Sequence, residues 1–186
     1  MIEPACDSEA LTQVLIDTPY GGILLGIDER RAPLTAANFL AYVDRGFLAQ
    51  ASIYRIVTLD NQAPGNSHPI EVIQWGWPAP DAGFAPPLPP VPHEPTSQTG
   101  LRHRDGTLSL ARNAPGSGGH GFFICRGDQP ELDEGGRRNP DLAGFAAFGR
   151  ILAEAETISR IMARAERTEY LQLQIPILDV RRLMRA

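Results

Sequence analysis

Short runs of apolar residues, several of them alternating with polar ones, recur along the chain and predict β-strands. The first two runs are separated by Thr18-Pro19-Tyr20-Gly21-Gly22, whose proline and glycines are typical of a hairpin turn. In the last run, Pro176 indicates a strand at a sheet edge or a barrel end, because proline cannot donate to a neighbouring strand. We expect eight strands, at residues 11–18, 22–28, 53–59, 71–77, 106–111, 121–125, 144–152 and 171–177.

Two segments change to the spacing of a helix, in which every third or fourth residue is apolar. In the first segment Pro33 stands just outside the helix, Thr35 is expected to cap its start and Gly46 to end it. In the second, Glu156 is placed to pair with Arg160 four residues later. The apolar faces consist of Ala36, Phe39, Leu40 and Val43 in the first segment and of Ile158, Ile161, Met162 and Ala165 in the second.

The order of these elements favours a mainly β protein, because strands do not alternate regularly with helices. We expect a closed eight-stranded antiparallel β-barrel capped by two α-helices. Hydrophobic residues make up 42% of the 186 residues. That is enough for one buried core, so a single domain is predicted over residues 11–183. Residues 1–10 are polar and predict an irregular N-terminal lead-in.

Residues 78–95 contain eight of the 17 prolines of the chain. Such a segment forms neither a central strand nor a helix, because proline lacks the backbone N–H that both require. It is predicted to be a rigid surface connector with polyproline character. A ligand for another proline-binding domain is the alternative interpretation.

The net charge is −5, from 22 acidic residues and 17 basic ones, and every basic residue is an arginine. This balance argues against a nucleic-acid partner, which requires a basic surface, and no apolar run is long enough to span a membrane. The first fifteen residues are acidic rather than basic and do not resemble a signal peptide. The location is expected to be cytoplasmic for the chain as written, or periplasmic if a leader was removed.

The residues give little support for nucleophilic, metal or cofactor chemistry. Two cysteines are too few for a zinc cluster, and Cys125 lies in an apolar run where a thiol behaves as a small hydrophobe. The glycine-rich residues 116–119 lack the ending of a phosphate-binding loop. Four histidines show no metal-ligand spacing and are expected in solvent-exposed loops: His68, His93, His103 and His120. No metal and no cofactor are predicted.

Arg55 is the most informative single residue, because it lies in a β-rich run among apolar neighbours that face a core. Two interpretations remain open from the residues alone. The arginine is either a structural residue held in a salt bridge or an electrophile in a pocket.

The order of short motifs along residues 11–183 resembles that of the cyclophilins, which are peptidyl-prolyl cis-trans isomerases built as an eight-stranded barrel with two capping helices. Each motif is weak alone, and their shared order is what carries the resemblance. The motifs are Ala32-Pro33-Leu34-Thr35-x-x-Asn38-Phe39, Tyr54-Arg55, Ile73-Gln74-x-Gly76, Gly106-Thr107-Leu108-Ser109-Leu110-Ala111-Arg112, Phe122-Phe123-Ile124, Leu132-Asp133 and Phe148-Gly149-Arg150-Ile151.

The resemblance implies roles for the residues at matching positions. Arg55 corresponds to the catalytic arginine, Gln74 to the glutamine that holds this arginine and the substrate carbonyl, and Phe123 to the floor of the proline pocket. Other lining positions of that pocket are Val72, Ala111 and Leu132.

Several positions depart from the family pattern and put peptide affinity, sequence preference and inhibition by cyclosporin-type compounds in question. Glu71 replaces a pocket phenylalanine, although strand alternation places it on the face opposite Gln74 and away from Arg55. Trp75 and Trp77 flank Gly76 where glycine and aspartate are usual, and Glu131 takes the place of a tryptophan. Four further replacements lie at expected substrate-binding positions: Arg112 for asparagine, His120 for serine, Gly121 for glutamine and Phe145 for histidine.

The resemblance therefore implies an enzyme that rotates Xaa–Pro peptide bonds to assist protein folding, without a cofactor. Its implied partners are proline-containing peptides and unfolded protein clients, and family members are commonly monomers. The departures in the pocket keep an alternative open: a proline-peptide-binding module or chaperone with weak or no turnover. A structural protein unrelated to proline is the third hypothesis.

Overall fold

The computed structural model describes residues 11–77, 85–153 and 155–184. The predicted lead-in at 1–10 and the first part of the proline-rich connector lie outside these residues. Within the described chain, no helix is long and apolar enough to cross a membrane.

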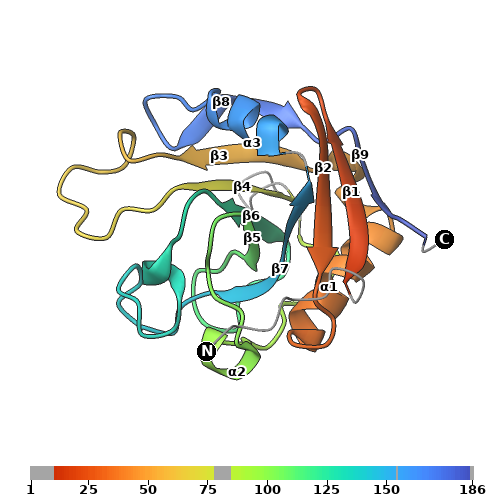
Figure 1. Ribbon diagram of the computed structural model, residues 1–186, viewed down its shortest axis with the longest axis horizontal. Helices are drawn as coiled ribbons and strands as arrows, with labels where there is room; N and C mark the ends of the chain where they lie inside the picture. Colours follow the sequence, from red (N-terminus) through yellow and green to blue (C-terminus); the bar gives the residue numbers. More distant parts are fainter. Residues whose placement is uncertain (1–10, 78–84, 154, 185–186) are drawn as a thin grey trace.

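Nine antiparallel strands form a single curled sheet (Figure 1). Their order across the sheet is β8-β3-β4-β6-β5-β7-β2-β1-β9, so most spatial neighbours are also hairpin or near neighbours in the chain. The strands are β1 (Thr12–Thr18), β2 (Gly21–Ile27), β3 (Ser52–Val57), β4 (Val72–Gly76), β5 (Thr107–Leu110), β6 (Gly121–Cys125), β7 (Ala146–Ala153), β8 (Tyr170–Pro176) and β9 (Asp179–Arg182).

The mainly β class is confirmed, with one strand more than predicted. β9 was missed because its side chains are mostly exposed and show no apolar alternation. β8 and β9 stand at opposite ends of the strand order but are joined by only Ile177 and Leu178. The Ile177 N–H donates to the Ala51 carbonyl and the Leu178 N–H to that of Asp17, so this corner links both edges of the sheet.

Both predicted helices are present, as α1 (Pro33–Asp44) and α3 (Ala155–Met162), and they lie at opposite ends of the curled sheet (Figure 1). Three shorter turns were not predicted: α2 (Thr96–Thr99), η2 (Phe47–Gln50) and η4 (Pro130–Leu132). Gly46 ends α1 as expected, since its φ of 68° is a left-handed conformation that favours glycine. The predicted Glu156–Arg160 ion pair on α3 is also formed.

The prediction for the start of α1 was wrong in two details. Pro33 is the first residue of the helix rather than a residue outside it, and Thr35 provides no cap from within the helix. Instead the carboxylate of Glu94, which is 1% exposed, accepts bonds from the N–H groups of Leu34 and Thr35 and from the Thr35 hydroxyl, at 3.2, 2.8 and 2.6 Å. An anion at this end also interacts favourably with the helix dipole.

Glu94 also shows how the last part of the proline-rich connector is attached. Val91 donates its N–H to the Gly118 carbonyl at 3.0 Å, and the His93 ring lies 2.9 Å from the Ala143 carbonyl oxygen. Residues 85–95 thus run along the body of the protein without entering a helix or strand, as predicted for a connector.

The sheet separates two apolar clusters of unequal size. The main core lies inside the curl and is centred on four aromatic rings that pack edge to face, those of Phe39, Trp75, Phe122 and Phe148. A second, smaller cluster lies on the other face of β4 and β6, because successive side chains of a strand point to opposite faces. We call it the outer cluster; it consists of Val57, Ile70, Val72, Phe123, Cys125 and Leu132.

Candidate active site

A cavity of about 460 Å³ opens over the outer cluster. Its walls come from β3, β4, β6 and β8, from the turn before β6 and from the long connection between β6 and β7. All ten residues predicted for the site line this one cavity, although they are spread over 91 positions of the sequence: Arg55, Val72, Gln74, Ala111, Arg112, His120, Gly121, Phe123, Leu132 and Phe145.

The floor of the cavity is apolar and rigidly supported. The Phe123 ring meets the Phe145 ring edge to face, with centroids 5.4 Å apart, and stacks on His103 at 6.0 Å. Val72 and Leu132 are both buried beside it. This arrangement gives a flat, dry surface of the kind that binds a small apolar ring.

His103 is buried, so the prediction of four exposed loop histidines was wrong; the other three are partly buried. Its Nδ1 lies 2.8 Å from the Asp133 carboxylate and its Nε2 2.9 Å from the Ser109 hydroxyl. Burial lowers the pKa of His103 and outweighs the opposing effect of Asp133. Although the residue types are those of a hydrolytic triad, Ser109 is fully buried and beyond the reach of a substrate. Asp133 and Ser109 instead fix the His103 ring, on which Phe123 stacks.

A β-bulge in β3 brings two polar side chains to the cavity instead of one. Ile53 pairs with Trp75 and Arg55 with Gln74, so Tyr54 is the extra residue between them. Tyr54 and Arg55 both line the cavity as a result. Regular alternation would have sent one of these neighbours into the main core.

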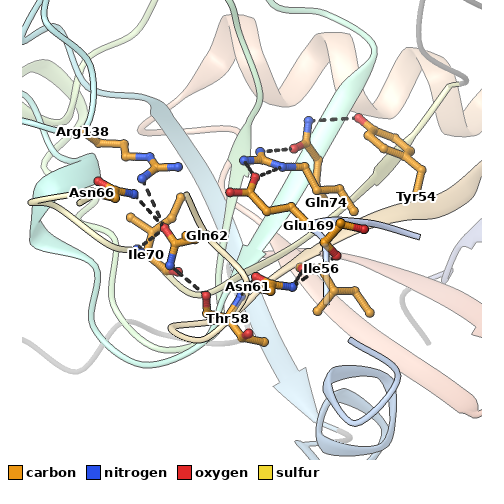
Figure 2. Close-up of polar contacts among 12 residues, drawn as sticks. Tyr54, Ile56, Thr58, Asn61, Gln62, Asn66, Ile70, Gln74, Arg138 and Glu169 are labelled. Carbon is orange, nitrogen blue, oxygen red and sulfur yellow. Dashed lines mark hydrogen bonds and ion pairs between the residues drawn. The ribbon is translucent and has the colours of Figure 1, made fainter. Parts of the chain in front are cut away.

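Arg55 is held by hydrogen bonds on two sides, to Gln74 and to Glu169, both of which are labelled in Figure 2. Its Nη1 donates to Gln74 Oε1 at 2.8 Å, and its Nε donates to Glu169 Oε2 at 2.9 Å. Its Nη2 forms an ion pair with the same carboxylate oxygen. Gln74 is fixed in turn, because its Nε2 donates to the Tyr54 hydroxyl at 3.0 Å. Arg55 is therefore both salt-bridged and part of a pocket, and the two interpretations from the sequence do not exclude each other.

Glu169 is a carboxylate partner of Arg55 that no pattern in the sequence indicates. Glu71 was considered as a partner of Arg55 and expected to point away, and among the described residues no hydrogen bond or ion pair joins the two. Glu169 precedes β8, whose first residue Tyr170 pairs with Arg55 across the β3–β8 ladder. The Tyr170 ring lies 5.5 Å from the guanidinium carbon and completes its surroundings.

Burial keeps the hydroxyl of Tyr54 protonated. Its pKa is raised to about 12, chiefly because the side chain is desolvated. The hydroxyl also occupies space next to Gly121, where a Cβ would stand only 3.1 Å from its oxygen. The glycine that departs from the family pattern thus makes room for Tyr54, which in turn fixes Gln74.

Arg112 forms a fixed wall of the cavity. Its Nη1 and Nη2 donate to the two carboxylate oxygens of Asp141 at 2.8 and 2.9 Å, and its Nε donates to the Gly144 carbonyl at 2.8 Å. The guanidinium carbon lies 5.0 Å from the centre of the Phe145 ring. The bonds from Arg112, together with one from the Ala143 N–H, lower the pKa of Asp141 to about 2, so this pair stays ionised at neutral pH.

The remaining predicted positions of the cavity wall are His120 and Ala111. His120 is partly buried, which lowers its pKa and favours the neutral ring. Its carbonyl oxygen would be 2.4 Å from a Cβ on Gly76, whose φ of 131° already requires glycine. Ala111 bonds through its N–H to the Gly121 carbonyl and contributes a small side chain to the wall.

Two further lining residues, Arg138 and Asn139, come from the polar segment between β6 and β7. In Figure 1 this connection and the one between β3 and β4 extend on the side of the sheet away from α1. These residues could not be predicted, because nothing in a charged stretch without periodicity indicates which side chain turns inward.

The cavity offers binding and a fixed cation rather than an activated nucleophile. Cys125 lies beneath it but is buried, which raises the pKa of its thiol. Within the part of the chain that the structure describes, no group of three or more histidine, cysteine or acidic residues could hold a metal ion. A curled antiparallel sheet that carries an apolar pocket beside a fixed arginine defines a ligand-binding class of protein, with a site for an apolar group next to a cation.

Comparisons with known proteins agree with this class. A sequence model described as "Cyclophilin type peptidyl-prolyl cis-trans isomerase/CLD" matches residues 13–182. The chain is 31% identical to the peptidyl-prolyl cis-trans isomerase A of Dickeya dadantii (strain 3937) over 159 residues, 85% of this chain and 75% of that protein. It is 30% identical to the peptidyl-prolyl cis-trans isomerase cyp18 of Streptomyces antibioticus over 152 residues, 81% of this chain and 83% of that protein.

A solved structure shows the same fold at lower identity. It is a cyclophilin type peptidyl-prolyl cis-trans isomerase of Cryptosporidium parvum in the presence of the dipeptide Ala-Pro. The TM-score is 0.73 at 20% identity, and the match covers 93% of this chain and 99% of that one. The chain therefore belongs to the cyclophilin-type peptidyl-prolyl cis-trans isomerases. Its activity is that of this family, the cis-trans isomerisation of peptide bonds that precede proline.

Proposed function

We propose that isomerisation takes place in the cavity over the outer cluster, with Arg55 and Gln74 at the rotating bond and Phe123 beneath the proline ring. The observation that carries this proposal is the position of the Arg55 guanidinium, fixed between Gln74 and Glu169 at the margin of an apolar floor. A hydrogen-bond donor and an apolar surface that can bind a ring thus lie next to each other.

The chemistry requires no proton transfer and no covalent intermediate. Rotation about the peptide bond faces a barrier of about 20 kcal/mol and takes on the order of tens to hundreds of seconds unaided at an Xaa–Pro bond. Twisting the bond ends its resonance and leaves a lone pair on the prolyl nitrogen. A donor aimed at that nitrogen binds the twisted form more tightly than either planar form and so lowers the barrier.

Arg55 keeps donors for this task. Each terminal nitrogen of a guanidinium carries two N–H groups, and Nη1 and Nη2 each use one in bonds to Gln74 and Glu169. The second N–H of each remains for a substrate. A charge-assisted hydrogen bond contributes about 1.5–3 kcal/mol, so the rest of the acceleration comes from orientation and exclusion of water in the pocket.

The substrate is a proline-containing peptide, and we assign its clients to unfolded segments of other proteins and the working form to a monomer. Val72 and Leu132 flank the ring site, while Ala111, Arg112, His120, Gly121 and Phe145 line the space for neighbouring peptide residues. The Cryptosporidium parvum relative crystallised in the presence of Ala-Pro supports a ligand of this size and chemistry.

A second candidate function is peptide binding with little turnover. The observation that favours it is the Glu169 carboxylate on Arg55, which partly neutralises the guanidinium that the reaction needs. The same carboxylate also fixes that guanidinium in place, and on this balance we favour a working isomerase.

Protease-coupled isomerisation of a short Ala-Ala-Pro-Phe peptide tests the proposal. We expect acceleration by the wild-type chain and a loss of about 10- to 150-fold in kcat/KM for Arg55→Ala, the equivalent of one charge-assisted hydrogen bond. Arg126→Ala serves as the matched control, because Arg126 does not line the cavity. Binding of the peptide without acceleration by the wild type would favour the second function.

A further inference from the structure

Three arginines line the cavity, and the lining includes no aspartate or glutamate among the described residues. Two of the three form ion pairs with carboxylates that do not line the cavity, Arg55 with Glu169 and Arg112 with Asp141. The third, Arg138, forms no ion pair with any carboxylate in the described ranges. A cation without a counter-charge in a peptide-binding cavity of an acidic protein requires an explanation.

Among the described residues, Arg138 donates hydrogen bonds only to neutral acceptors. Its Nη1 donates to Gln62 Oε1 and to the His68 carbonyl, both at 3.2 Å. Within the described chain its Nε and Nη2 make no hydrogen bond. The side chain is partly buried. Its pKa is lowered by burial and by the charge of Arg55, while Glu169 acts in the opposite direction from beyond ion-pair distance.

The side chain of Arg138 is held in place by a network of hydrogen bonds centred on Gln62. Gln62, which receives its bond, donates through Nε2 to the Thr58 and Ile70 carbonyls at 2.8 and 3.0 Å. Gln62 Oε1 also accepts from Asn66 and from the Ile70 N–H, both at 3.1 Å. Figure 2 shows Arg138 pointing from this network toward Gln74 and Glu169.

We propose that Arg138 forms an anion subsite of the cavity, which binds the carboxylate of an aspartate or glutamate next to the proline of the substrate. The inference rests on the proposed function, since it needs the peptide to bind in this cavity. The unused Nε and Nη2 donors supply the two parallel bonds with which arginine binds a carboxylate.

The subsite acts locally rather than by the field of the whole protein. The net charge of −5 repels acidic peptides at long range. A partly buried guanidinium in contact with a carboxylate overcomes this, because water screens the pair less than it screens exposed charges. The other two arginines attract an anion less strongly, since the charge of each is already offset by a carboxylate partner.

The test uses the full chain and peptides that differ only beside the proline. Alanine, glutamate or lysine is placed before the proline in one series and after it in another, and exchange NMR gives kcat/KM for each. In one of the two series we expect glutamate to exceed alanine by about 3- to 10-fold and alanine to exceed lysine, the size of a partly screened ion pair. About 1 M salt should reduce this preference, because its screening length is about 3 Å.

Three variants assign the preference. Arg138→Gln should make the glutamate and alanine peptides equal, and Arg138→Lys should retain a preference because the charge is kept. Arg137→Gln is the matched control, since the Arg137 side chain is exposed, pairs with Glu131 and does not line the cavity.

Equal rates for the glutamate and alanine peptides in the wild type overturn the anion subsite, and so does a preference that persists in Arg138→Gln. Failure of the proposed function has a different signature, which is no acceleration of any peptide. In that case NMR titration gives the dissociation constants of the glutamate and alanine peptides. Equal dissociation constants for the two peptides overturn the subsite.

Discussion

The carboxylate of Glu169 binds the guanidinium of Arg55 from a position 114 residues away in the chain. The side chains are about equally accessible, at 20% and 19%. An ion pair of this kind stabilises modestly in itself, but here it also decides where the donors of Arg55 point. Together with Gln74 it holds the guanidinium from two directions.

We predict that Glu169→Ala lowers kcat/KM about 3- to 10-fold, because Arg55 loses two of its fixed bonds and the freed side chain must be ordered again on each substrate. Glu169→Gln should lose less, since the amide oxygen still accepts a bond from Arg55. The protease-coupled assay measures both. The loss should appear in kcat per folded molecule, with the folded fraction taken from circular dichroism, because a general loss of structure also lowers the apparent kcat.

Glu156→Ala on α3 is the control, because it removes a similar carboxylate–arginine pair far from the cavity. If Glu169→Ala is as fast as the wild type or faster, the carboxylate competes with the substrate for Arg55 instead of positioning it.

Gly121 and Tyr54 are predicted to depend on each other. Gly121→Ala places a Cβ 3.1 Å from the Tyr54 hydroxyl oxygen, so Tyr54 must move and its bond to Gln74 weakens. We expect about a 3- to 10-fold loss of kcat/KM from this variant, equivalent to roughly one hydrogen bond. Tyr54→Phe alone removes the same bond and should cost a similar factor.

The double variant Tyr54→Phe/Gly121→Ala distinguishes the proposed coupling from two independent effects. Because both changes act on one bond, we expect the double variant to be no slower than the poorer single variant. Multiplied losses in the double variant would show that the two residues act separately.

The fold was largely predictable because its strands are short and bounded by glycine, proline or polar turns. Alternation along β4 correctly placed Val72 on the same face as Gln74, since both residues line the cavity. The β-bulge at Tyr54 was not predictable, since no residue there is typical of one and the extra residue shows only in the pairing of β3 with β4. β9 was not predictable for a different reason: its side chains are mostly exposed, so they show no apolar alternation.

The site residues were predicted from motif order, and all ten of them line the one cavity. Glu169 and Arg138 were missed because each lies in a polar segment where neither period nor spacing distinguishes an inward charge from a solvated one. His103 was misplaced for the related reason that polar neighbours predict exposure, whereas Asp133 and Ser109 satisfy its ring nitrogens in the interior. Long-range polar pairs of this kind depend on the folded chain.

The Glu94 carboxylate is predicted to stabilise the whole fold through α1. Glu94→Gln removes the charge at the helix start and turns an amide N–H₂ toward groups that are themselves donors. We expect the free energy of unfolding to fall by about 1–3 kcal/mol, the cost of an unsatisfied buried donor. Urea titration followed by circular dichroism measures it, with the exposed Glu134→Gln as control. An unchanged urea midpoint would contradict a capping role.

Stability is predicted to fall as the pH is lowered from 7.5 to 5.5, because His103 is buried and its pKa is lowered from 6.5. Below 6.5 the unfolded chain binds a proton at this position that the folded chain resists, so protons favour unfolding. His120 acts in the same direction, since burial lowers its pKa too, while the lowered pKa of Asp133 starts from 3.8 and matters only in more acidic solution.

The free energy of unfolding, from urea titrations at several pH values, measures this dependence. A single histidine can change this free energy by at most about 1.4 kcal/mol per pH unit. His103→Asn lowers stability at every pH because it disturbs the bonds to Asp133 and Ser109, so the slope rather than the absolute value is compared. We expect a shallower slope in His103→Asn and a smaller change in His120→Gln, because His120 is only partly buried. A wild-type slope that His103→Asn leaves intact would assign the proton uptake to other groups.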